Sequence, residues 1–120
     1  MKFISSSIGH EISAVLYGID KKLINDSNYL KLVIMNALKK DKFTILKDID
    51  HKFSPQGYIL NVLLSESHLA IHTYPEYNSI YFGLYSCKSK GHGKKTYEFF
   101  VNKLKPKEIV VDMKDIIVKK

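Results

Sequence analysis

A stretch in the middle of the chain, residues 65–76, concentrates the side chains that can do chemistry. It carries hydroxyl, imidazole and carboxylate groups between two apolar runs, at Glu66, Ser67, His68, His72 and Glu76. Cys87, the only cysteine of the chain, follows eleven residues after the last of them. Hydroxyls and thiols act as nucleophiles, and imidazoles and carboxylates carry protons. The composition of this stretch is that of a catalytic cluster.

The spacing within the cluster indicates how a strand would present it. Glu66, His68 and His72 differ by even numbers, so a regular strand would point them to the same face. Ser67 would point the other way, and we expect a bend at the Glu66–Ser67 step. A bend is also what a serine hydroxyl needs to approach the preceding carbonyl carbon. The proline before Glu76 breaks the strand, so a turn must place that carboxylate.

The bulk composition is that of one globular domain spanning residues 1–120. The chain is 45% hydrophobic and 26% charged, which argues against disorder. No apolar run approaches the roughly 20 residues that span a bilayer, and the first residues are not apolar enough for a signal peptide. A single cysteine forms no internal disulfide, so we expect a cytoplasmic protein.

The net charge of +7 raises the question of a nucleic-acid partner. However, the lysines are dispersed along the chain, with no interleaved aromatic residues and no known binding motif. We interpret them as a solvated surface, and expect neither a nucleic-acid partner nor a membrane partner.

Apolar periodicity and turn residues predict alternating strands and two helices. The predicted strands cover residues 12–19, 44–53, 58–64, 69–73, 80–87 and 109–113. One predicted helix runs from the caps at residues 25–27 to about residue 40, and the other has its apolar stripe at residues 97–104.

Strands joined by short turns pair antiparallel, and two helices can cover only one face of such a sheet. The expected fold is therefore α+β, a two-layer sandwich of an antiparallel sheet with two helices on one face. Strand segments such as Ile59–Leu60 and Val62–Leu64 are apolar on both sides. That pattern suits a sheet covered on both faces and favours a homodimer.

In its order, the cluster resembles the bacterial and archaeal S-adenosylmethionine decarboxylases. The resemblance is carried by Glu66-Ser67-His68, then by His72-Thr73-Tyr74-Pro75-Glu76, then by a strand that ends in Cys87. It implies a proenzyme of polyamine biosynthesis that cuts its own Glu66–Ser67 bond into fragments 1–66 and 67–120. An ester forms first, then β-elimination and hydrolysis convert Ser67 into the pyruvoyl cofactor, whose ketone forms a Schiff base with the substrate amine.

The resemblance also implies a role for each site residue. Ser67 supplies the pyruvoyl group, His72 assists processing, and Cys87 protonates the product carbon. Phe53 matches an aromatic residue that stacks on adenine, and Glu76 matches a carboxylate that holds the ribose hydroxyls. We place His68 with these two at the substrate, and expect no metal.

Three positions depart from the pattern of the family. Ile59 stands where a serine that helps processing belongs, Val15 replaces a glutamate of the first strand, and Gly83 replaces a further acid. The loss of polar groups around a retained cluster indicates a changed substrate or slow processing.

Other functions stay open. Some relatives of this family decarboxylate L-arginine or L-ornithine with the same pyruvoyl chemistry. Phe53 and Glu76 suit a nucleoside better, so S-adenosylmethionine ranks first. Outside this chemistry, the chain could be a nucleic-acid-binding module, or a metal site formed by the histidines and carboxylates of residues 66–76.

Overall fold

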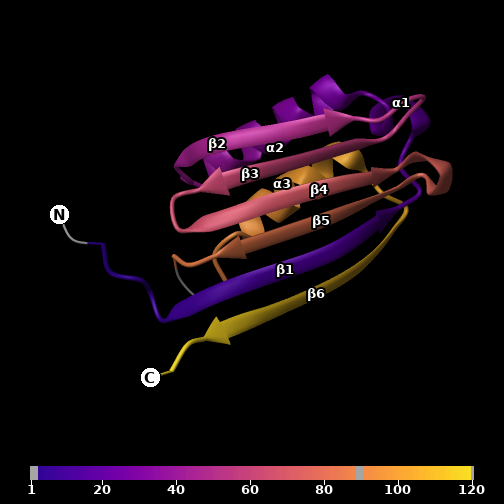
Figure 1. Cartoon of the computed structure of the whole chain (residues 1–120). Coiled ribbons are helices and arrows are strands. Elements are labelled where there is room, and N and C mark those ends of the chain that lie inside the picture. Colours follow the sequence, from indigo (N-terminus) through magenta and orange to yellow (C-terminus); the bar gives the residue numbers. More distant parts are fainter. Residues whose placement is uncertain (1–2, 89–90, 120) are drawn as a thin grey trace.

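Six strands form one antiparallel sheet in the order β2-β3-β4-β5-β1-β6 (Figure 1). The computed structural model describes residues 3–88 and 91–119. The strands are β1 (Ile8–Tyr17), β2 (Ile45–Lys52), β3 (Tyr58–Leu64), β4 (Ser67–Tyr74), β5 (Ser79–Ser86) and β6 (Glu108–Ile117). The helices are α1 (Lys21–Ile24), α2 (Ser27–Lys40), the short 3-10 helix η1 (Pro75–Tyr77) and α3 (Lys94–Leu104).

The two long helices, α2 and α3, cover one face of the sheet and lie behind the strands in Figure 1. Every second residue of a strand points toward them, since strand side chains alternate between the two faces. The layer between is filled by fully buried apolar side chains, among them Ile12, Leu30, Leu69, Phe82 and Phe100. The predicted α+β two-layer sandwich is confirmed.

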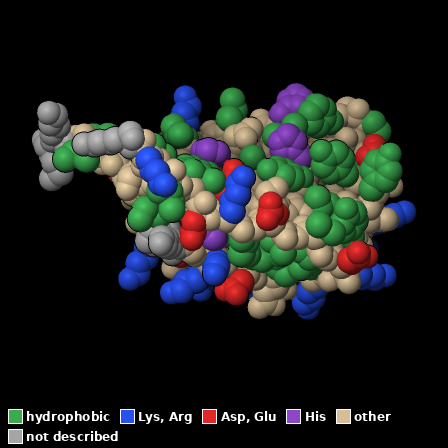
Figure 2. All heavy atoms as spheres, turned by 90° about the horizontal axis from the view of Figure 1, so that it is seen from below, with side chains coloured by type: hydrophobic (Ala, Val, Ile, Leu, Met, Phe, Trp, Pro, Cys, Tyr) green, Lys and Arg blue, Asp and Glu red, His purple; other side chains and the backbone are tan. Residues whose placement is uncertain are grey.

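No helix of the described part of the chain covers the other face, which we call the open face. Its centre is built by alternate residues of β1, β4 and β5, namely Glu11, Ser13, Val15, His68, Ala70, His72, Tyr81, Gly83 and Tyr85. In the view of Figure 2, apolar and histidine side chains gather in the middle of the surface, and lysines are scattered mostly near its margin.

The neighbouring strands β1 and β6 both extend beyond their predicted ranges at the end of the sheet where Ile8 and Ile117 pair. β1 begins at Ile8, four residues early, and β6 continues to Ile117, four residues late. These two residues lie opposite each other in the β1–β6 pair. Near the same end, His10 Nδ1 lies 2.9 Å from Asp115 Oδ1. The sequence does not predict this end of the two strands, because charged residues there interrupt the apolar alternation that is typical of a strand.

Two short helices were not predicted. α1 has only four residues, too few for an apolar period, and begins where the Asp20 carboxylate accepts a hydrogen bond from the Lys22 backbone N–H at 2.7 Å. η1 begins at Pro75 and places Glu76 in a turn, as the proline indicates. No helix within the described ranges is long and apolar enough to cross a membrane.

Candidate active site

The bend predicted at the Glu66–Ser67 step is present as a tight hairpin turn between β3 and β4. Leu64 pairs with Ser67, which leaves Ser65 and Glu66 as the two turn residues. Glu66 has a φ of 69°, in the left-handed region that residues with a side chain rarely adopt. Such a conformation costs on the order of 1 kcal/mol. The peptide bond between Glu66 and Ser67 therefore lies in strained backbone.

Ser67 and Cys87 meet at this end of the sheet. Ser67 is the first residue of β4 and is only 5% exposed, on the face that the helices cover. Its Oγ accepts a hydrogen bond of 3.1 Å from the backbone N–H of Cys87, which directly follows β5. Two residues that are far apart in the sequence, one with a hydroxyl and one with a thiol, are thus neighbours through the backbone of Cys87.

Tyr85 links this pair to the open face. Its pKa is raised, chiefly by a hydrogen bond with Cys87 and further by burial and by the charges of Cys87 and Glu11. The ring of His68 lies 5.8 Å from that of Tyr85, centroid to centroid. The thiol of Cys87 therefore has a phenol as its neighbour, with an imidazole one strand away.

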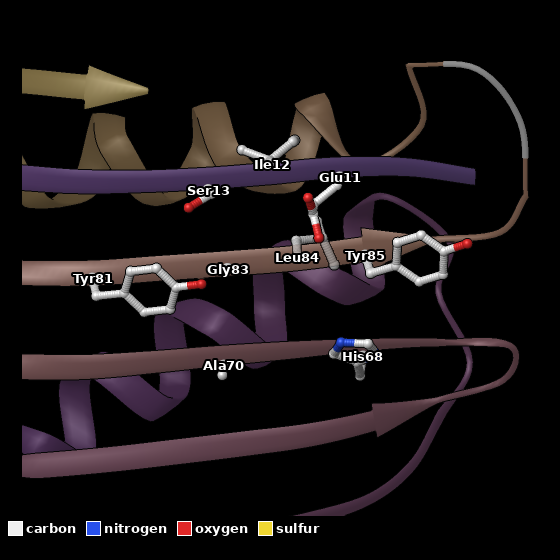
Figure 3. Close-up of a pocket in the computed structure, with 9 residues that line it drawn as sticks. All are labelled: Glu11, Ile12, Ser13, His68, Ala70, Tyr81, Gly83, Leu84 and Tyr85. Atoms are coloured by element: carbon white, nitrogen blue, oxygen red, sulfur yellow. The ribbon is translucent and has the colours of Figure 1, made fainter. Parts of the chain in front are cut away.

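A hollow of about 210 Å³ opens on the open face beside these residues (Figure 3). Glu11, His68, Tyr81 and Tyr85 line it, and Gly83 lies at its centre. Figure 3 shows the Tyr81 ring lying along its strand, with the hydroxyl directed at Gly83. A Cβ atom at Gly83 would collide with that hydroxyl. The loss of the acid expected at this position thus makes room for a tyrosine.

Sequence reasoning missed Glu11. It expected an acid at Val15, whereas the carboxylate of this chain stands four residues earlier on the same open face. The even spacing of the two positions along β1 is the signal that could have found it. Glu11 supplies the hollow with a negative group, whose Oε1 lies 3.7 Å from Lys114 Nζ.

The departures from the family pattern surround His72. Ile59 and Tyr81 are its partners on the two neighbouring strands, and Val15 follows Tyr81 in the same row across the sheet. The rings of His72 and Tyr81 meet edge to face with centroids 5.9 Å apart. The imidazole therefore lies between an alkyl and an aromatic side chain, and not beside a hydroxyl of β3.

The remaining predicted residues lie toward the opposite end of the sheet from Ser67. Phe53 follows β2, is 48% exposed and packs its ring edge-on against His51, with centroids 4.6 Å apart. Glu76 is exposed in η1. Among the described residues, no three His, Cys, Asp or Glu side chains come together as a metal site. One protomer thus gathers Glu66, Ser67, His68 and Cys87, and leaves Phe53, His72 and Glu76 elsewhere.

Comparison with known proteins assigns this chain to a family. The model of the S-adenosylmethionine decarboxylase family matches residues 10–115. The chain belongs to that family. The resemblance carried by the 66–76 cluster and Cys87 is therefore confirmed.

Individual relatives agree with this assignment. The S-adenosylmethionine decarboxylase proenzyme of Picrophilus torridus is 31% identical over 86% of this chain and 79% of its own. That of Brevibacillus brevis is 35% identical over 86% of this chain and 77% of its own. The crystal structure of the adenosylmethionine decarboxylase from Aquifex aeolicus superposes with a TM-score of 0.87 at 25% identity, covering 97% of this chain and 96% of that one.

Proposed function

We propose that this chain is the proenzyme of a pyruvoyl-dependent S-adenosylmethionine decarboxylase of polyamine biosynthesis, and that it acts in the cytoplasm. The observation that carries the proposal is the 3.1 Å contact between Ser67 Oγ and the backbone N–H of Cys87. It joins the residue that would become the cofactor to the residue that would protonate the product, in a chain of the right family.

Self-cleavage follows from the geometry of the turn. The Ser67 hydroxyl attacks the carbonyl carbon of Glu66, and cleavage would release the strained conformation of Glu66 (φ 69°). The resulting ester loses the Glu66 carboxylate by β-elimination. Hydrolysis of the dehydroalanine, with release of its nitrogen as ammonia, then leaves a pyruvoyl group at the start of fragment 67–120, and Glu66 ends fragment 1–66.

The surroundings of Ser67 fit a pyruvoyl group. Once the chain is cut, residue 67 is the free start of β4, next in the chain to His68, which lies on the open face beside Tyr85. The ketone supplies the electron sink for decarboxylation. Cys87, whose backbone N–H binds Ser67 Oγ and whose thiol has Tyr85 as a neighbour, would deliver a proton to the substrate carbon.

A complete site needs a second copy of the chain. His72 follows Ser67 by five residues on β4, so at about 3.3 Å per residue the two are about 17 Å apart. Phe53 and Glu76 lie beyond His72, and Figure 1 shows the β2–β3 and β3–β4 connections at opposite ends of the sheet. Two open faces packed about a two-fold axis would bring the far end of one sheet over the end of the other sheet at which Ser67 begins β4.

The open face has the character of an interface. Ile49, Leu63, Tyr74 and Val110 are large apolar residues that are exposed in the single chain. Large exposed apolar residues on four strands of one face favour an interaction site there. The strands predicted to be apolar on both sides are thus explained by a homodimer that buries both faces of the sheet.

The far end of the open face also suits the adenosyl group. Val15, Ser79 and the aromatic residues Tyr17, Tyr74, Tyr77 and Tyr81 line a largely apolar cavity of about 480 Å³ there. Aromatic faces stack on a base and attract a sulfonium cation. Together with the exposed ring of Phe53, this cavity favours S-adenosylmethionine.

Glu11 favours the second candidate, a pyruvoyl-dependent L-arginine or L-ornithine decarboxylase. Its carboxylate stands in the hollow next to His68 and Tyr85, where it would pair with the cationic end of a short basic substrate. A substrate bound in this way would not use the aromatic cavity at the far end of the sheet.

The test begins with the intact mass of the purified chain. We expect two fragments, 1–66 and 67–120, with the second carrying a pyruvoyl group, and one uncut chain for Ser67→Ala. Release of labelled carbon dioxide from S-adenosylmethionine, arginine and ornithine then separates the two candidates. A wild-type chain that stays uncut after long incubation would contradict both.

A further inference from the structure

Three polar side chains form a row of contacts on the helix-covered side of the sheet, at the end that carries the Glu66–Ser67 turn. Ser86 Oγ lies 2.7 Å from Nδ1 of His92. On the other side of the ring, Nε2 of His92 lies 3.3 Å from the backbone oxygen of Asp41 and 3.5 Å from its Oδ1. Ser86 is fully buried and Asp41 is 7% exposed. They come from the end of β5, the loop before α3, and the C-cap of α2.

A structural role explains only part of this arrangement. Asp41 Oδ2 accepts hydrogen bonds from the backbone N–H and the hydroxyl of Thr96, at 3.1 and 2.8 Å. It thereby caps the first turn of α3, whose own N-cap residue Gly93 has no side chain. This cap uses one carboxylate oxygen and requires neither the imidazole of His92 nor the hydroxyl of Ser86.

The arrangement is also no hydrolase site. A serine, a histidine and a carboxylate in a row activate the serine for attack on a substrate. Ser86 has no exposed surface, so a carbonyl group from solution cannot reach its hydroxyl. Only neighbouring groups of the chain itself can exchange a proton with it.

Ser67 is such a neighbour. His68 pairs with Tyr85 in the β4–β5 ladder, so one further step places Ser67 opposite Ser86. Both are buried on the helix-covered face, and residues opposite each other in an antiparallel pair have Cβ atoms about 5 Å apart. The hydrogen bond from the Cys87 N–H holds Ser67 Oγ at this position.

We propose that Asp41, His92 and Ser86 form a relay that takes the proton from the Ser67 hydroxyl during self-cleavage. The inference rests on the proposed function. Ser67 Oγ gives its proton to Ser86 Oγ while the Ser86 proton passes to Nδ1 of His92. Ser67 Oγ then forms its bond to the carbonyl carbon of Glu66.

The carbon–nitrogen bond between Glu66 and Ser67 breaks next, and the proton on His92 returns through Ser86 to the released amine of Ser67. The step is an isomerisation of amide to ester with no net gain or loss of protons. His92 acts through Ser86, so it is a positioning residue for the reacting serine.

The surroundings of His92 suit this role. The carbonyl oxygen of Asp41 accepts the proton of Nε2 and thereby leaves Nδ1 free to accept from Ser86. The charged groups described around the ring are the Asp41 carboxylate, the Lys94 ammonium near Gly91, and Lys88. Lys88 Nζ donates to Lys42 O at 2.6 Å and lies over the Phe43 ring. That ring packs on His92 with centroids 4.6 Å apart.

The test measures the rate of self-cleavage of the full chain from newly synthesised protein. In His92→Asn, the side-chain oxygen can still accept a hydrogen bond from Ser86, but the base is gone. We expect cleavage about tenfold slower or worse in the folded variant, and loss of the pH dependence that an imidazole base gives to the cleavage rate. Ser86→Ala, a smaller change in case His92→Asn folds poorly, should show the same slowing.

Thr96→Val is the matched control, because it removes a hydrogen bond to the other oxygen of Asp41 and leaves His92 and Ser86 intact. It should lower the melting temperature and cleave within about twofold of the wild-type rate. Equal cleavage by His92→Asn and wild type, or equal slowing by Thr96→Val, would overturn the relay. A wild-type chain that never cleaves would instead overturn the proposed function.

Discussion

Complementation between two inactive variants tests the shared site most directly. Ser67→Ala removes the residue proposed to become the cofactor, and His72→Ala removes the imidazole proposed to assist processing. Within one chain these residues lie about 17 Å apart along β4, far beyond the roughly 3 Å of a hydrogen bond. In a mixed two-fold dimer, one site would combine Ser67 of one variant with His72 of the other, and the second site would lack both.

The expected size of the effect follows from symmetry. Random pairing of equal amounts gives mixed dimers for about half of all dimers, so about half of the His72→Ala chains acquire an intact partner. We therefore expect about half of the His72→Ala chains to cleave, and decarboxylation at about a quarter of the wild-type level. Co-expression with two different affinity tags, followed by intact mass and carbon dioxide release, measures both quantities.

The control partner is the double variant Ser67→Ala/His72→Ala, which can form the same dimer but offers no imidazole. The His72→Ala chains should stay uncut with this partner. If they cleave equally fast with either partner, His72 does not act across the dimer and the two-fold arrangement of the open faces is wrong. Light scattering that shows only a monomer would refute the homodimer itself, and with it the shared site.

Three further outcomes are expected. Cys87→Ala should still cleave but lose most turnover and release an aldehyde in place of the amine, detected by mass spectrometry; full activity would remove the thiol from the mechanism. Ile59→Ser restores a hydroxyl beside His72 and should speed cleavage a few-fold relative to Ile59→Ala, in a time course of intact mass. Tyr58→Phe removes a 2.7 Å hydrogen bond to Asp50 and should cost at most about 1 kcal/mol at pH 7, since Asp50 is exposed. This bond is the main cause of the lowered pKa of Asp50, so the stability it gives is lost as pH falls below the usual 3.8. Urea unfolding curves of wild type and Tyr58→Phe should converge there.

Much of the fold could be predicted from local patterns. β3 was predicted residue for residue, because its apolar run ends at clear turn signals at both ends. The outer ends of β1 and β6 could not be predicted, because their polar residues are held by each other, as His10 and Asp115 are. Such pairs form only once distant parts of the chain meet.

The candidate site also has features that the sequence could predict and features that it could not. The bend at Ser67 could be predicted from the alternation of side chains along a strand, and its positive φ at Glu66 fits that reasoning. The distance between Ser67 and His72, by contrast, is a property of an extended strand that a list of residue types does not convey. Glu11 and His92 were missed because each becomes relevant only through a neighbour on another element.

The strand order has a consequence for what happens after a cut at the Glu66–Ser67 bond. Fragment 1–66 would hold β1, β2 and β3, and fragment 67–120 would hold β4, β5 and β6. In the sheet, however, β1 lies between β5 and β6. Strand β1 of the first fragment therefore lies between two strands of the second fragment, and makes backbone hydrogen bonds to both of them. The two pieces would stay together, because separating them would require the β1–β5, β1–β6 and β3–β4 pairings all to break.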